Sequence, residues 1–381
     1  MPIRIVLLIV LLNMTAYRGS KVVVTLFAAE LGVSQFLVGV LVAVYSIFPM
    51  LLGIFAGKLT DRLGVRLPMT AGTSGVAMAL LVPFTFPGVP ALYISAVLLG
   101  ASWVFYNVCA QNLMGILSER ESRARNFTNF GLVMAGGSFF GPIISGFSID
   151  HVGHAQTYLH LAVLPFMSAL ILISLRSVPA GLGKGKVSEE HAEYSANLLG
   201  NKALRRTLVT SAIVLTGTDL FQFYMPLYGH AIGLSASAIG MVLGAFAVAA
   251  FVVRLVMAPM VKRFGADRLL VWSLFMGGAA YVLFPVFENA ILLAAVAFIL
   301  GLGLGCSQPL SLMLIYERAP EGRSGEALGL RMTINNFMHI AIPLFFGSLG
   351  TLFGVAPVFL ANAAIMTAGG IISREKSTTR R

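Results

Sequence analysis

The chain has 381 residues, of which 57% are hydrophobic and 11% are charged, whereas soluble domains carry about 25% charged residues. Apolar segments of about 20 residues, the length that crosses a bilayer as a helix, recur along the whole chain. These features exclude an ordinary soluble fold and predict an all-α polytopic membrane protein.

Twelve apolar segments are expected to form membrane-spanning helices, six on each side of a polar stretch. In chain order they cover 5–28, 36–57, 68–87, 90–116, 126–149, 156–178, 205–229, 236–259, 267–287, 290–315, 326–348 and 351–372. The predicted organisation is an N-terminal six-helix bundle (1–180), a cytoplasmic linker (181–204), a C-terminal six-helix bundle (205–372) and a cytoplasmic tail (373–381).

The net charge of +11 is distributed over alternate loops. Lys and Arg gather at 57–66, 119–125, 184–206, 261–268, 317–323 and in the tail. The opposite loops, near positions 30, 88, 152, 231, 288 and 350, contain neither. This positive-inside pattern predicts that both termini are cytoplasmic, in a plasma membrane such as a bacterial inner membrane. A nucleic-acid-binding surface would not alternate with the helices, so no nucleic acid partner is expected. Part of the charge can hold anionic lipid headgroups.

The sequence has no arrangement typical of a catalytic or cofactor site. Cys109 and Cys306 lie within apolar segments and lack metal-site spacing. No Gly-x-x-x-x-Gly-Lys-Ser/Thr phosphate-binding loop occurs. The first segment resembles a signal peptide, but no small-residue cleavage site follows it, so we expect it to be retained. We expect no metal, no cofactor and no enzymatic activity.

The two halves of the sequence repeat at an offset of 201 positions. ELGVSQFLVGVLVAVYSI (30–47) aligns with AIGLSASAIGMVLGAFAV (231–248), and GKLTDRLG (57–64) aligns with APMVKRFG (258–265). Repeated halves that keep the same orientation are a transporter architecture, in which the substrate site lies between the halves near the middle of the membrane. The repeat therefore predicts a transporter with a central site.

The segment GKLTDRLGVR resembles the signature loop of the major facilitator superfamily, and the six-plus-six layout is similar to that family over the whole chain. The residues that carry the resemblance are Gly57, Leu59, Asp61, Arg62, Gly64 and Arg66. Val65 departs from the pattern, which usually has a basic residue there, and the second copy lacks the leading Gly and the Asp. The resemblance implies a twelve-helix fold and a cytoplasmic latch, in which Gly57 permits close helix contact and Asp61 faces the N-terminal end of the helix at 326–348. The spacing alone is equally compatible with a plain tight turn.

A second segment, GGSFFGPIISGF (136–147), resembles the fifth-helix pattern of the same family, which is associated with antiporters. The matching residues are Gly137, Gly141, Pro142 and Gly146. Small residues four positions apart permit close helix packing, and a proline bends the helix. Generic packing of small residues would give the same pattern. The fourth helix weakens the antiporter interpretation, because 98–112 has no charged residue, whereas drug–proton antiporters of the family usually carry an Arg there.

Polar residues interrupt the first and seventh helices at equivalent positions, each set spaced by three along one helical face. The sets are Thr15, Arg18 and Lys21 and, 201 positions later, Thr216, Asp219 and Gln222. A charge at the centre of a bilayer costs roughly 2.5–3.5 kcal/mol on insertion scales, so such residues indicate a functional site. The resemblance implies that these helices line a central cavity, and we expect the two polar stripes to face each other across it.

Two hypotheses account for these charges. In the first, Arg18 and Lys21 bind an anionic or zwitterionic substrate, and Asp219, the one carboxylate placed deep in the membrane, couples transport to protons. In the second, Arg18 and Asp219 form a static ion pair, while Lys21 extends toward the outer surface. Two cations against one carboxylate favour the first hypothesis.

Other polar side chains are weaker candidates for substrate contacts. They are Tyr17, Asn107, Gln111, Gln222, Tyr224, Tyr228, Gln308, Asn335 and His339. Asn335 and His339 lie four positions apart on one helical face. A histidine can titrate near neutral pH, although a histidine in a membrane helix is more often a packed hydrogen-bonding group. Arg254 and Arg331 lie near predicted cytoplasmic helix ends, where we expect an interfacial or latch role.

The sequence thus predicts a monomeric secondary transporter that works by alternating access. The expected partners are a small organic substrate, more anionic than cationic, together with protons and the lipid bilayer. The main alternative is a broad-specificity drug or metabolite exporter that works as a proton antiporter. A non-transporting membrane sensor is a remote alternative.

Overall fold

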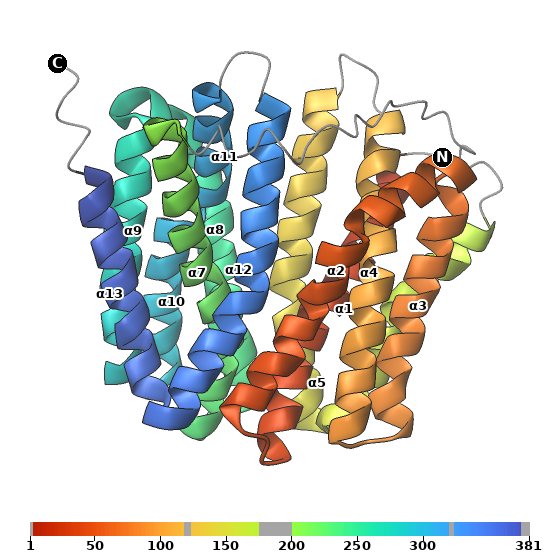
Figure 1. The fold of residues 1–381 in the computed structure, drawn as a ribbon. Coiled ribbons are helices and arrows are strands. Elements are labelled where there is room, and N and C mark those ends of the chain that lie inside the picture. The colour runs from red at the N-terminus through yellow and green to blue at the C-terminus, as the bar shows by residue number, and fades with distance from the viewer. Residues whose placement is uncertain (1–2, 118–122, 175–199, 320–323, 375–381) are drawn as a thin grey trace.

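The computed structural model describes residues 3–117, 123–174, 200–319 and 324–374, which form helices joined by short turns (Figure 1). The elements are α1 (Ile3–Glu30), α2 (Gln35–Leu63), α3 (Arg66–Thr85), α4 (Val89–Leu117), α5 (Arg123–Ser174), α7 (Lys202–Ala231), α8 (Ala236–Phe264), α9 (Ala266–Leu283), the 3₁₀ turn η1 (Phe284–Val286), α10 (Ala290–Leu304), α11 (Ser307–Arg318), α12 (Ser324–Phe353) and α13 (Val355–Arg374).

Eleven helical segments within the described residues are long and apolar enough to cross a membrane. One of them, Asn129–Ser174, has 46 residues, about twice the length of a single span. It contains Gly153, whose φ of 82° interrupts the helical backbone of α5. Counting α5 as two spans, the described segments give twelve, which confirms the predicted all-α polytopic fold.

The turns of the two halves have the same backbone geometry at the offset of 201. Positive φ angles pair Gly32 (71°) with Gly233 (78°), Gly64 (76°) with Gly265 (82°), and Gly153 (82°) with Gly354 (83°). Glycine adopts such angles without the penalty that a Cβ brings. Gly354 separates α12 from α13, so its counterpart Gly153 marks the same boundary between two spans within α5.

The segment 290–315 was predicted to be a single helix, and the structure differs from this prediction. The structure has two helices here, α10 and α11, interrupted at Gly305 and Cys306. In a continuous helix the carbonyl of Gly305 would accept from residue 309, but Pro309 has no N–H. Instead, Nε of Arg254 on α8 donates to this carbonyl at 2.8 Å. Arg254 therefore stabilises the break.

The chain forms two halves, α1–α5 and α7–α13, with α1 beginning and α13 ending at the same end of the molecule (Figure 1). We call this the termini end, and the other the opposite end. The halves meet through α1 with α7, α2 with α12, and α5 with α8.

The closest backbone approaches between the halves lie at the opposite end and are related by the same offset of 201. A Cβ at Gly39 would lie 2.3 Å from the carbonyl oxygen of Pro343, and one at Gly240 would lie 2.5 Å from that of Pro142. A second mirrored pair joins Gly347 to Gln35 and Gly146 to Ala236. The sequence repeat is thus also a two-fold symmetry of the contacts that close this end.

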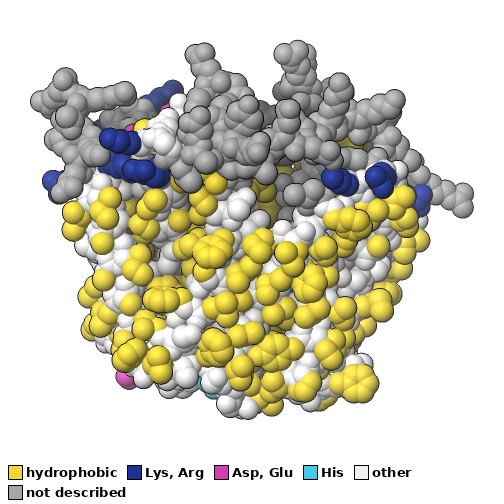
Figure 2. All heavy atoms as spheres, viewed as in Figure 1, with side chains coloured by type: hydrophobic (Ala, Val, Ile, Leu, Met, Phe, Trp, Pro, Cys, Tyr) yellow, Lys and Arg dark blue, Asp and Glu magenta, His cyan; other side chains and the backbone are white. Residues whose placement is uncertain are grey.

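The surface agrees with a membrane location. Figure 2 shows hydrophobic side chains over the middle of the molecule and Lys and Arg along the margin at the termini end. The apolar band is the surface that lipid would cover, and the basic margin matches the alternating loops of the sequence.

Candidate functional site

The polar stripes of α1 and α7 meet between the two halves. Nη1 of Arg18 donates to Oε1 of Gln222 at 2.5 Å, so the two stripes meet at these residues as expected, whereas Thr216 lines a pocket between α7, α12 and α13. Nε of Arg18 is buried and has no hydrogen-bond partner within the described residues. Both side chains are half-buried, and the guanidinium keeps unused donor capacity.

The carboxylate of Asp219 does not hydrogen-bond to Arg18. Instead, its Oδ2 shares a hydrogen bond with Nδ1 of His339 on α12. Lys21 and Arg18 remain within electrostatic range of the carboxylate. This places a titratable pair at the junction of α7 and α12, close to two cations on α1.

Two tyrosine rings lie beside the ammonium of Lys21. Its Nζ lies 5.2 Å from the ring centroid of Tyr17 and 5.8 Å from that of Tyr45, both distances at which a ring face attracts a cation. The ring of Tyr17 in turn stacks on Trp103 at 3.9 Å with an interplanar angle of 11°. The ammonium therefore lies against one ring of α1 and one of α2, and it has no hydrogen-bonded carboxylate within the described residues. We call Arg18, Lys21, Asp219, Gln222 and His339 the central polar site.

The polar face of α12 continues from His339 toward the termini end. Nη2 of Arg331 donates to Oε1 of Gln308 at 2.5 Å and to Oγ of Ser311 at 3.3 Å, both on α11. Oδ1 of Asn335, between Arg331 and His339, is buried without a partner in the described part of the chain. Arg331, for which an interfacial or latch role was expected, thus bonds to α11 from the face of α12 that also carries Asn335 and His339.

The remaining candidates form no hydrogen bond to this cluster within the described residues. On α4, Asn107 is half-buried and Gln111 is exposed, and neither hydrogen-bonds to another described residue. The hydroxyl of Tyr224 donates to Oε1 of Gln35 across the halves. The hydroxyl of Tyr228 donates to the carbonyl of Phe287 at 2.9 Å.

A carboxylate that the sequence analysis left without a role closes the opposite end. Asp150, near the Gly153 turn of α5, accepts hydrogen bonds from the backbone N–H groups of Ala236 at 2.9 Å and Ser237 at 2.8 Å. These groups begin α8, so Asp150 caps a helix of the other half. The symmetry-related contact is neutral, because Oγ1 of Thr351 accepts from the N–H of Phe36 at 2.9 Å.

The chain matches one protein family along most of its length. The family model described as Major Facilitator Superfamily matches residues 6–236 and 207–377, which together cover nearly the whole chain. The chain belongs to the major facilitator superfamily.

Relatives within the superfamily include proteins named for drug resistance. The chain is 21% identical to the multidrug resistance protein MdtG of Klebsiella pneumoniae (strain 342), over 88% of this chain and 82% of the relative. It is 22% identical to the quinolone resistance protein NorA of Staphylococcus aureus (strain MRSA252), over 93% of this chain and 91% of the relative.

Solved structures of superfamily transporters share the fold. The peptide transporter POT matches with a TM-score of 0.82 at 15% identity, over 97% of this chain and 93% of that chain. The nucleoside transporter NupG matches with a TM-score of 0.80 at 13% identity, over 98% and 99% of the two chains. At these identities the likeness concerns the fold alone.

The superfamily signature loop is only partly described. α2 ends at Leu63, Gly64 takes a φ of 76°, Arg62 is exposed, and Nη2 of Arg66 donates to the carbonyl of Ile173 at 3.2 Å. The side chain of Asp61 lies outside the described residues, as do the first side chains of α12. Among the described residues, nothing outside the local helix backbone lies within 4 Å of a Cβ built on Gly57. The close helix contact expected at Gly57 therefore stays a prediction, because the first side chains of α12 lie outside the described residues.

The fifth-helix pattern packs against two different helices. Cβ atoms at Gly137 and Gly141 would lie 2.7 Å from Met14 and 2.8 Å from the carbonyl oxygen of Thr15, so these glycines bring α5 onto α1. Pro142 and Gly146 instead contact α8 of the other half. The pattern therefore joins the helix that carries Arg18 to the contact that closes the opposite end.

Proposed function

We propose that this protein is a proton-coupled secondary transporter of a small organic solute with an anionic group. The observation that carries the proposal is the pairing of Asp219 with His339. Because that carboxylate bonds to α12, Arg18 and Lys21 have no hydrogen-bonded carboxylate in the described part of the chain. A carboxylate or phosphate of the substrate would supply the missing partner.

The Asp219–His339 pair is the proposed proton-coupling group. When Asp219 takes up a proton, its attraction for Arg18 and Lys21 is lost, and both cations are free to hold an anion. Proton and anion then favour each other's binding, which is the thermodynamic requirement for symport. The pair joins α7 to α12, so its protonation also changes a contact within the C-terminal half.

We also propose the orientation. The basic loops support a cytoplasmic location for both termini of a plasma-membrane protein. The closed opposite end then faces outward, and the structure corresponds to an inward-facing state of alternating access.

A second candidate is a broad-specificity drug exporter. It is favoured by the names of the relatives MdtG and NorA and by the fifth-helix pattern. An exporter of this kind would exchange its substrate for protons at Asp219. Binding of the proton would then weaken binding of the substrate, whereas in symport each strengthens the binding of the other.

The test is flux in proteoliposomes with and without an imposed pH gradient, using a panel of organic anions and cationic drugs. We expect acid on the entry side to accelerate anion uptake. Asp219→Asn should abolish the response to the gradient while counterflow exchange continues. Glu288→Gln, a matched change at an exposed position, should behave as wild type. Gradient-independent flux in the wild type, or a gradient response that survives in Asp219→Asn, would overturn the proposal. Drug flux that competes with protons would favour the exporter.

A further inference from the structure

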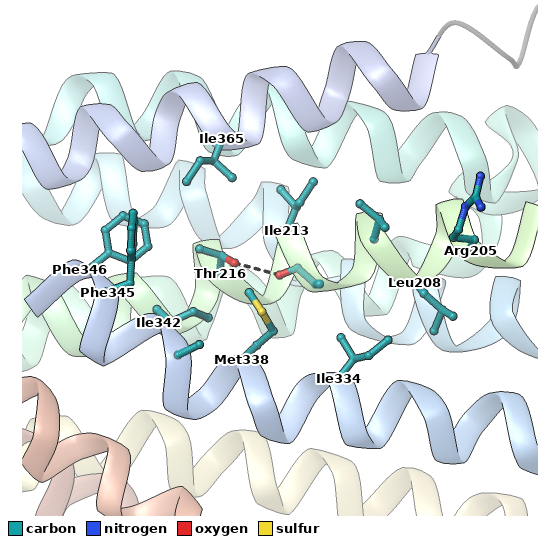
Figure 3. A pocket seen from close by; sticks show the side chains of 13 residues that line it. Arg205, Leu208, Ile213, Thr216, Ile334, Met338, Ile342, Phe345, Phe346 and Ile365 are labelled. Carbon is teal, nitrogen blue, oxygen red and sulfur yellow. Dashed lines mark hydrogen bonds between the residues drawn. The ribbon is translucent and has the colours of Figure 1, made fainter. Parts of the chain in front are cut away.

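An apolar groove runs along the outside of the C-terminal half, between α7, α12 and α13 (Figure 3). It has a volume of about 460 Å³, within the range of small-molecule sites. Its walls include Leu208, Ile213, Met338, Ile342, Phe345 and Ile365. Val209 and Phe345 are 51% and 58% exposed, so the groove opens on the surface that lipid would cover.

The groove is about as long as one membrane leaflet is thick. It extends along α7 from Arg205 to Thr216, the middle of that helix, which is about 16 Å at 1.5 Å per residue. The hydrocarbon core of a bilayer is about 30 Å thick, so one leaflet measures about 15 Å. In Figure 3, Arg205 lies at one end of the groove and Phe345 and Phe346 lie at the other.

The two ends differ in charge. Arg205 is exposed, and its side chain forms no hydrogen bond or ion pair with another described residue. It lies one turn into α7, at the termini end, where other Lys and Arg side chains gather. The lining otherwise offers one hydroxyl, that of Thr216, which donates to the carbonyl of Ala212 at 3.0 Å. The groove is thus cationic at its entrance and apolar along its length.

We infer that this groove binds one anionic phospholipid from the leaflet at the termini end, with an acyl chain along the groove and the headgroup phosphate at Arg205. An anionic solute does not fit, because the interior offers it no polar partner beyond the entrance. An acyl chain needs none, and juxtamembrane basic residues attract anionic headgroups.

The lipid would act on the helix that holds His339. Met338 and Ile342 line the groove, while their neighbour His339 contacts Asp219 from another face of α12. An acyl chain packed on α12 therefore supports the helix that positions the titratable pair.

The test is native mass spectrometry of the purified full chain, titrated with phosphatidylglycerol or phosphatidylcholine. Arg205→Gln should weaken phosphatidylglycerol binding about fivefold, and Ala341→Phe should weaken binding of both lipids by filling the groove. Arg268→Gln and Ala71→Phe make the same changes at exposed positions outside the groove, and they should bind lipid as wild type does.

Lipid binding unchanged in Arg205→Gln, or lost equally in the control variants, would overturn the inference. So would a loss of dye binding, measured with ethidium, in Ala341→Phe while phosphatidylglycerol binding stays intact, because the groove would then belong to a solute. If Ala341→Phe does not purify as a folded protein, Arg205→Gln alone decides. The measurement needs no flux, so its failure is distinguishable from failure of the proposed transport function.

Discussion

Lys21 is held by aromatic rings at a depth where a bare ammonium is costly. The faces of Tyr17 and Tyr45 lie 5.2 and 5.8 Å from its Nζ and offer partial compensation for lost hydration. Rings do not neutralise the charge, and the nearest carboxylate, Asp219, bonds to His339. Lys21 therefore combines a fixed position with an unneutralised charge, as a recognition group for an anion requires.

Replacing Lys21 by Met tests its charge while keeping an unbranched apolar side chain. Hydrogen bonds to charged groups contribute about 1.5–3 kcal/mol, so we expect the Kd of a transported anion to rise at least about tenfold. The measurement is radioligand binding to the purified protein. Lys262→Met, an exposed change on α8, is the matched control. An unchanged Kd in Lys21→Met would remove Lys21 from the proposed site.

At the scale of elements, the mirrored approaches of α2 to α12 and of α8 to α5 hold the opposite end closed. A Cβ on Gly39 or Gly240 would lie 2.3 or 2.5 Å from a proline carbonyl oxygen, closer than atoms can pack. We expect Gly39→Ala and Gly240→Ala each to destabilise this packing by about 1–3 kcal/mol. The Tm in detergent should fall to a similar extent in the two variants.

Gly53 provides the control within α2. Among the described residues, nothing outside the local helix backbone lies within 4 Å of a Cβ built there, and alanine is the better helix former by about 1 kcal/mol. The Tm of Gly53→Ala should stay the same or rise. If all three substitutions changed the Tm equally, the close approaches at Gly39 and Gly240 would not be the cause of the change.

The Asp150 cap makes a separate prediction for α8. Asp150→Ala removes the acceptor of two N–H groups, and loss of an N-cap costs about 0.5–2 kcal/mol. Hydrogen exchange of the amides of Ala236 and Ser237 should therefore accelerate roughly 2- to 30-fold. The first turn of α2 serves as an internal control, and Asp267→Ala at the termini end as a matched variant. Unchanged exchange at the start of α8 would contradict the capping role.

At the scale of the whole molecule, the distribution of Lys and Arg predicts sidedness. Green fluorescent protein fused to either terminus should fluoresce, because it matures in the cytoplasm, and alkaline phosphatase fused there should be inactive. The same phosphatase inserted after Glu288, in a loop without Lys or Arg, should be active. The reverse pattern of activities would invert the proposed orientation and the inward-facing assignment.

The fold was largely predictable because each span is a long apolar segment and the halves repeat. The break between α10 and α11 was not recognised, because its cause, the missing N–H of Pro309, is a single residue inside an apolar segment. The site was predictable where the repeat applies, as in the facing stripes of α1 and α7. The repeat pairs Asp219 with Arg18, however, and carries no information about α12, so the contact with His339 needed the structure. The cap at Asp150 could have been suspected, because Pro142, Gly146 and Asp150 recur in spacing as Pro343, Gly347 and Thr351.

The two mirrored caps at the opposite end are equal in backbone geometry but unequal in strength. A carboxylate accepts from two amides at α8, whereas one hydroxyl accepts from one amide at α2, and charge-assisted hydrogen bonds are roughly twice as strong as neutral ones. We expect the caps to rupture in order, first between α2 and α12 and last between α5 and α8. The opening path then passes through an intermediate in which the cap between α2 and α12 is broken while the cap between α5 and α8 is intact.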